Sequence, residues 1–91
     1  MEVTGVVKRV EATKTVGAND FKMRNVVVTT EAQYPQTLSI QFVQGNVSLL
    51  DNLAEGTKVK IAIELRGREV TKEDGSLAVF NTIQGWKIEK L

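Results

Sequence analysis

The stretch that decides the fold spans residues 45–56 and reads GNVSLLDNLAEG. Asn46 is a residue type that caps helix N-termini, and Gly56 is one that ends helices in a left-handed conformation. Between them, four apolar residues fall on one helical face: Val47, Leu49, Leu50 and Leu53. This spacing predicts a helix from about Asn46 to Ala54. A helix of about two to three turns is not stable alone in water, so we expect it to pack against the rest of the chain.

Three strands are predicted before this helix. Residues 2–16 are rich in β-branched side chains, and residues 21–30 contain a run of three valines that is apolar on both faces. Residues 37–43 alternate apolar and polar side chains. Gly5 marks a bend in the first strand, which allows that strand to serve both halves of a barrel.

The alternation also predicts which side chains face the core. We expect Phe21 and Met23 to face inward from the second strand, and Phe42 to face inward from the third. Lys22 and Arg24 then face outward. Ser39 and Gln41 belong to the polar phase of the third strand, so these outward residues together predict a mildly basic, hydrogen-bonding surface.

Two strands follow the helix. Residues 57–70 return to a period of two, and residues 77–91 form the last strand. Asp74-Gly75 is a strong hairpin-turn signal between them. The side chains expected to face inward from the first of these strands are Val59, Ile61, Ile63 and Leu65.

The order of elements is therefore β-β-β-α-β-β. Five strands with one short helix between the third and fourth are typical of the OB-fold, a small all-β Greek-key barrel. An SH3-like barrel lacks this helix, and a ferredoxin-like fold needs a second one. We expect a single OB-fold domain over residues 1–91, since nothing in the sequence reads as a linker or a repeat.

The composition limits the functions that are possible. The 91 residues carry a net charge of +1 and include neither histidine nor cysteine. Zinc sites of the usual types and Ser-His or Cys-His catalysis are excluded, and we expect no enzymatic activity, no metal site and no cofactor. The N-terminus does not resemble a signal peptide, and about 18 apolar residues never run together. We therefore expect a cytoplasmic protein that does not enter a membrane.

Three segments resemble a known family. Residues 31–35 match an E-x-Q-Y-P motif, and residues 65–69 (LRGRE) and 85–90 (GWKIEK) are similar to further segments of the same family. Its members are short proteins of unknown function from Bacteroides-like bacteria and their phages. They are described as OB-fold proteins similar to single-stranded DNA-binding proteins. The resemblance covers nearly the whole chain and implies, by analogy, binding of single-stranded nucleic acid.

OB-folds bind single strands on the face of their second and third strands, between two flanking hairpin loops. Arg66 and Arg68 share one strand phase about 7 Å apart, a spacing that matches successive phosphates. Phe80 and Trp86 are the aromatic side chains available for base stacking, with Gly85 leaving room beside Trp86; packing in a core or an interface is the alternative for Trp86. The candidate nucleic-acid-binding residues are Lys14, Lys22, Arg24, Gln41, Arg66, Arg68, Lys72, Phe80 and Trp86.

We therefore expect a non-enzymatic protein that binds single-stranded DNA, or alternatively RNA, with little sequence preference. The alternative is a protein–protein interaction or assembly module that binds no nucleic acid. The near-neutral charge and the lack of an acidic tail after Leu91 favour this alternative, since a basic excess is usual in nucleic-acid binders. In either case we expect a homo-oligomer, a dimer or tetramer, formed by pairing of first-strand edges between subunits.

Overall fold

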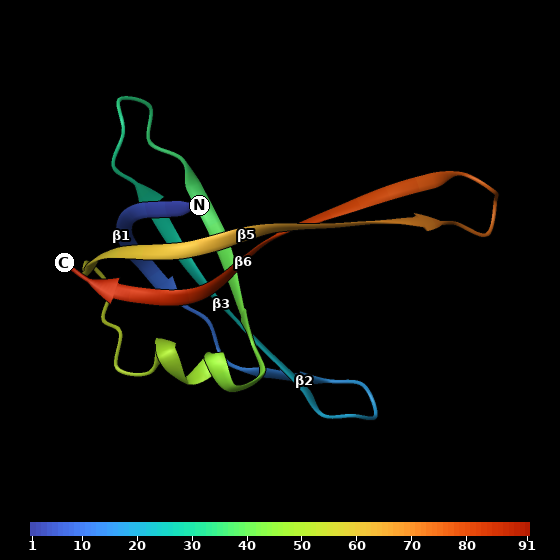
Figure 1. The fold of residues 1–91 in the computed structure, drawn as a ribbon, viewed down its shortest axis with the longest axis horizontal. Coiled ribbons are helices and arrows are strands. Elements are labelled where there is room, and N and C mark those ends of the chain that lie inside the picture. Colours follow the sequence, from blue (N-terminus) through green and yellow to red (C-terminus); the bar gives the residue numbers. More distant parts are fainter.

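The computed structural model describes all 91 residues, which form six strands and one short helix. The strands make one sheet in the order β1-β5-β6-β4-β3-β2, and additional pairing of β1 with β3 closes it into the expected OB-type barrel (Figure 1). The elements are β1 (Glu2–Val10), β2 (Lys14–Val16), β3 (Phe21–Thr30), β4 (Thr37–Val43), the 3₁₀ helix η1 (Gln44–Leu50), β5 (Lys58–Thr71) and β6 (Leu77–Lys90).

The first predicted strand is divided into β1 and β2. Both pair antiparallel with β3. The partner of β1 is the second half of β3, and the partner of β2 is the first three residues of β3. Residues 11–13 interrupt them, although the Glu11 N–H still donates to the Asn25 carbonyl at 2.9 Å. Because β2 continues β1 along the same partner, the barrel keeps the predicted five-strand plan.

Gly5 lies where β1 changes partners, as predicted. It pairs with Thr30 of β3 and with Val59 of β5. A Cβ atom at this position would lie 2.6 Å from a carbonyl oxygen of β3, so only glycine allows the two strands to approach so closely. The register shift itself follows the glycine, between Val7 and Arg9.

The core is small, with 13 of the 91 residues buried. It confirms the inward assignment of Phe42 on β4 and of three of the four apolar side chains expected inside on β5. Leu65 is the exception, with 64% of its surface exposed, because β5 has left the barrel by that point. The core cluster comprises Val7, Val26, Val28, Ile40, Phe42, Leu50, Val59, Ile61 and Ile63.

The helix lies between β4 and β5, but it is shorter and tighter than the sequence predicts. It is a 3₁₀ helix preceded by Val43, which makes no side-chain capping bond, so the assignment of Asn46 as the cap is wrong. The Ser48 hydroxyl donates to the Gly45 carbonyl at 3.0 Å, three residues back, which favours the tighter turn. Leu50 is 1% exposed and packs in the core cluster.

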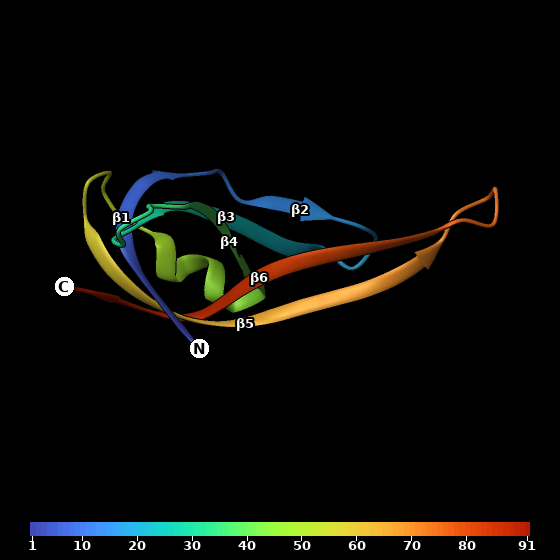
Figure 2. The same cartoon turned by 90° about the horizontal axis from the view of Figure 1, so that it is seen from above.

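The molecule has extents of 46 × 34 × 19 Å, and two of its hairpins project from the same side of the barrel (Figure 1). The longer one, which we call the arm, comprises residues 64–84 of β5 and β6 and their connecting turn (Figures 1 and 2). Its turn is the predicted one: Gly75 has a φ of 84° and its N–H donates to Lys72 at 2.9 Å. The shorter one, the β2–β3 hairpin, projects on the same side of the barrel as the arm (Figure 1).

Within the sheet, β4 and β6 are joined by a very short parallel ladder. It consists of two residue pairs, Ile40 with Ile83 and Gln41 with Gln84. The arm and the β3–β4 surface therefore meet at this ladder.

Candidate functional site

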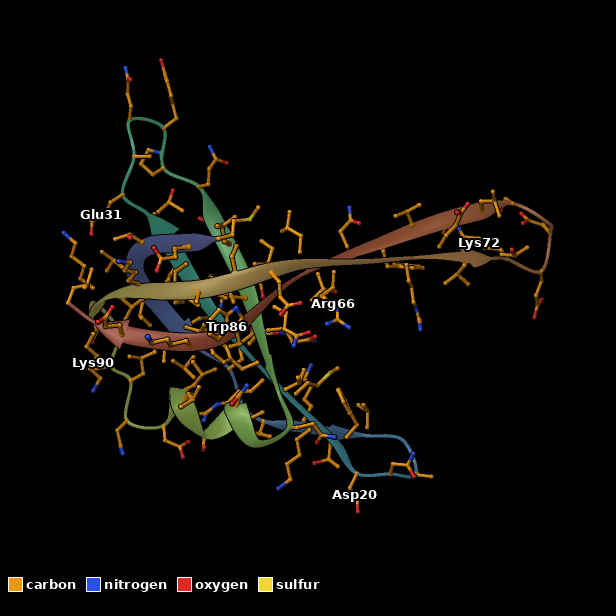
Figure 3. The ribbon with its side chains drawn as sticks, in the orientation of Figure 1. Asp20, Glu31, Arg66, Lys72, Trp86 and Lys90 are labelled. Carbon is orange, nitrogen blue, oxygen red and sulfur yellow. The ribbon has the colours of Figure 1, made fainter.

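The structure contains one pocket, of about 420 Å³, at the junction of the arm with β3 and β4. It brings together four of the nine residues predicted to bind nucleic acid, namely Gln41, Arg66, Arg68 and Phe80. Three further lining residues were not predicted: Met23, Gly67 and Thr82. Figure 3 shows Arg66 on the side of the arm that faces the β2–β3 hairpin.

The arm contributes a basic and aromatic face to this pocket. Arg66 lies directly opposite Thr82 and Arg68 directly opposite Phe80 in the antiparallel ladder, so all four side chains share one face of the arm. Phe80 is 57% exposed, which leaves its ring accessible. The strand phase that predicts Phe80 also identifies Thr82, two residues later on the same face.

The two arginines differ in their partners. Arg66 forms an ion pair of 3.5 Å with Glu64 on the same strand, and both side chains are more than half exposed. Such an exposed pair contributes little to stability, because water screens it. Arg68 has no acidic partner within 4 Å, so its charge is free to bind an anion.

Met23 and Gln41 form the floor of the pocket, on β3 and β4. Ile40 and Phe42 point into the core, which turns Gln41 outward as predicted. The Gln41 side-chain amide lies 3.8 Å from the Met23 sulfur, as a weak hydrogen bond that orients it. The inward assignment of Met23 is wrong. Val26 and Val28 face the core, so the even-numbered residues of β3 lie on the inner face and Met23 lies on the outer one.

Arg24 and Lys22 follow this same core phase, so they lie on the face of β3 opposite to Met23 and the pocket. Arg24 is directed to η1: its Nη1 lies 2.7 Å from Asp51 Oδ1 and donates to the Val47 carbonyl at 3.3 Å. Its Nε donates to the Glu11 carbonyl at 2.9 Å. With 19% of its side chain exposed, Arg24 connects the helix to the break between β1 and β2.

The remaining predicted residues are dispersed. Lys14 pairs directly with Met23 and therefore shares the outer face of the β2–β3 hairpin. Lys72 lies at the far end of the arm, and Trp86 lies on the barrel part of β6 (Figure 3). Trp86 is half-exposed at a register shift in the β5–β6 ladder and does not line the pocket. The space at Gly85 is taken by Phe42, whose ring would be 2.5 Å from an added Cβ, and not by Trp86.

One carboxyl group has a shifted pKa, at the turn of the arm. The Ser76 hydroxyl and the Ser76 N–H donate to Asp74 Oδ1 at 2.6 and 2.9 Å. These bonds favour the charged form and lower the pKa of Asp74 below its ordinary value. The turn that orders the tip of the arm is therefore held by an ionised aspartate.

Neither a metal cluster nor a membrane helix is present in the structure. No three acidic, histidine or cysteine side chains lie together. No helix is both long and apolar enough to cross a membrane.

The sequence model of one protein family, the domain of unknown function DUF3127, matches residues 2–89 of this chain. The chain belongs to the DUF3127 family. The resemblance noted in the sequence to a family of unknown function is therefore confirmed. Among curated proteins, no sequence matches this DUF3127 chain.

Solved structures show which fold this DUF3127 chain shares. A crystal structure of the mitochondrial single-stranded DNA binding protein Rim1 from S. cerevisiae superposes with a TM-score of 0.76 at 15% identity, covering 100% of this chain and 92% of that one. A second crystal form of Rim1 gives a TM-score of 0.71 at 14% identity with the same coverage. At this identity the likeness shows the fold, which is the OB-fold predicted from the order of elements.

Proposed function

We propose that this chain is a non-enzymatic, cytoplasmic protein that binds single-stranded nucleic acid, preferring DNA to RNA, with low sequence specificity. The observation that carries the proposal is the gathering of Arg66, Arg68 and Phe80 on one face of the arm, beside the polar floor residue Gln41. The fold that the chain shares with a single-stranded DNA binding protein supports it.

In the proposed complex, Arg66 and Arg68 bind successive phosphates, because side chains two apart on one strand are about 7 Å apart. Phe80 stacks on a base, a contact that contributes about 1–3 kcal/mol and tolerates any base. Gln41 at the pocket floor and Thr82 on the arm donate and accept hydrogen bonds. A surface with two cations and one stacking ring predicts moderate affinity that decreases with salt.

The experiment is a titration of fluorescent oligo-dT with the protein at two salt concentrations. Replacing both arginines, Arg66→Ala with Arg68→Ala, should make the dependence of log K on log salt shallower by roughly 1.4, at about 0.7 per phosphate contact for a single strand. The matched control is Lys87→Ala with Lys90→Ala, which removes the same charge from exposed positions in the barrel part of β6. No binding at low salt, or an equal change in both double variants, contradicts the proposal.

A second candidate function is a protein–protein assembly module. The observation that favours it is the opposite face of the arm, where Leu65, Leu77 and Val79 are each 64% exposed. Three large apolar side chains on one face of an uncovered hairpin are typical of an interaction surface. This candidate and nucleic-acid binding use different faces of the arm, so one protein is able to do both.

We also propose that the chain assembles into a dimer or tetramer. The first-strand edges expected to pair between subunits are occupied only in part, since residues 2–4 of β1 pair with β5 but not with β3, and residues 7–10 pair with β3 but not with β5. Both edges of the arm are free beyond the barrel, because residues 65–71 and 77–82 pair only with each other. The arm is therefore a second proposed contact, beside the free parts of the β1 edges.

A further inference from the structure

The β2–β3 hairpin carries an apolar pair that the core does not use. Phe21 is 37% exposed and Val16, directly opposite it in the ladder, is 43% exposed. The sequence pattern placed Phe21 in the core, which is wrong because β3 extends beyond the barrel at this end. Neither residue lines the pocket.

The register connects this pair to the pocket. Phe21 and Met23 are two residues apart on β3, so their side chains share one face about 7 Å apart. Lys14 is paired with Met23 and shares that face as well. The face therefore runs without interruption from the floor of the pocket, at Met23, past one lysine to a phenylalanine.

This face of the hairpin and the pocket face of the arm carry the same combination of side chains, an aromatic ring near a basic group. On the arm, Phe80 lies opposite Arg68 and beside Arg66. On the hairpin, Phe21 lies beside Lys14, and no acidic side chain lies within 4 Å of the Lys14 ammonium. Both hairpins project from the same side of the barrel (Figure 1). The pocket is lined by residues of the arm, of β4 and of β3, which continues into the β2–β3 hairpin. An aromatic ring with an adjacent free cation is the combination that binds a nucleotide by stacking and charge.

We propose that Phe21 is a second base-stacking residue, with Lys14 binding the adjacent phosphate. A single strand would then run from the arm across Met23 and Gln41 and onto the β2–β3 hairpin. This inference rests on the proposed function and extends it: the ligand is a strand long enough to reach both hairpins, and the pocket alone holds only part of it.

The test compares two lengths of fluorescent oligo-dT, because only a long strand reaches the hairpin. OB-folds bind about 4 to 16 nucleotides, so strands of about 4 and about 15 nucleotides bracket the range. Phe21→Ala should weaken binding of the long strand roughly 5- to 150-fold, the loss of one stacked base, and leave the short strand unchanged. Phe80→Ala should weaken both.

Two variants keep the result interpretable. Tyr34→Ala removes an aromatic ring that is 75% exposed on the β3–β4 loop and should change neither affinity. Phe21→Leu keeps the apolar side chain of the hairpin and removes the ring, so it should reproduce the loss on the long strand if Phe21→Ala fails to fold.

The possible failures are distinct. If the unmodified protein binds neither oligonucleotide, the proposed function itself is wrong. If it binds both and Phe21→Leu leaves the long strand unaffected, or weakens both lengths equally, the nucleic-acid proposal stands and the second stacking residue is wrong.

Discussion

Two anions compete for Arg66 in the proposed complex. In the free protein its guanidinium lies 3.5 Å from the Glu64 carboxylate, and a bound phosphate would have to replace or accommodate that carboxylate. Arg68 carries no such partner. At the scale of single residues, Glu64 therefore acts against the function proposed for its neighbour.

Glu64→Gln should increase the affinity for oligo-dT by about two- to fivefold, since it removes a negative charge beside the phosphate site. Fluorescence titration at low salt measures the change. The control is Glu69→Gln, which removes the same charge from the opposite face of the arm. An equal gain in both variants would show that net charge alone is responsible.

Gly85 tests the packing of the barrel. A Cβ atom there would overlap the Phe42 ring at 2.5 Å and meet Ile40 at 3.0 Å, and both side chains are fully buried. Gly85→Ala should lower the free energy of unfolding by about 1–3 kcal/mol through overpacking. Urea denaturation measures this, and the double variant with Phe42→Leu should recover part of the loss. Unchanged stability would mean that Phe42 moves aside without cost.

Residue phase was predictable from the sequence in β4 but not in β3. In β4, polar residues separate Leu38, Ile40 and Phe42, so the inner face is unambiguous. In β3, residues 26–28 are valines of both phases and all three are buried. The apolar pattern of β3 is therefore the same on both faces and does not show which face is inward. Only the pairing of β3 with β4 shows on which face Met23 and Arg24 lie.

At the scale of elements, the arm is a two-stranded ribbon without support beyond the barrel. Isolated hairpins are marginally stable in water, so its order depends on its turn and on whatever covers its apolar face. The turn is fixed by bonds from Ser76 to the Asp74 carboxylate.

The lowered pKa of Asp74 predicts how this turn responds to acid. A carboxyl group whose pKa is lower in the folded turn contributes stability above its ordinary pKa of 3.8, and this contribution is lost as the pH falls through the lowered value. The Ser76 N–H donates to this carboxylate, so its protection from hydrogen exchange should be lost only below that ordinary pKa. NMR of the Ser76 amide against pH measures this, and in Asp74→Asn the acid-dependent step should be absent. A step at the same pH in the variant would assign it to another group.

The limits of the strands were largely predictable, because turn signals depend only on residues that are close in the sequence. The limits of β3 and β4 agree with the predicted ones, and those of β5 and β6 agree within one residue. The helix and the exposure of Leu65 were not predictable in the same way. Both depend on where the barrel ends, which is a property of the whole sheet and not of a segment.

At the scale of the molecule, the surface is larger than expected for its mass. The accessible area is 6277 Å², whereas a compact monomer of 10.1 kDa has about 5,300 Å². The excess of roughly 1,000 Å² is comparable to the area of about 800 Å² that each partner buries in a standard interface.

Light scattering at micromolar concentration should therefore give the mass of a dimer or tetramer. Leu77→Glu with Val79→Glu places charges on the apolar face of the arm and should shift the protein toward monomer, because buried unpaired charges oppose association. Lys72→Glu, at the tip of the arm, serves as the control. A monomeric unmodified protein would contradict the assembly.

The ladder between β4 and β6 has a consequence for how the chain reaches this structure. Its two pairs join residues 43 positions apart, Ile40 with Ile83, whereas the hairpins close over short loops. Contacts of such separation carry a large loop-closure entropy and form after local ones. Gln41 belongs to one of these pairs, and the pocket spans the junction. The pocket, unlike the local turns of the two hairpins, should thus take shape only after the ladder between β4 and β6 has formed.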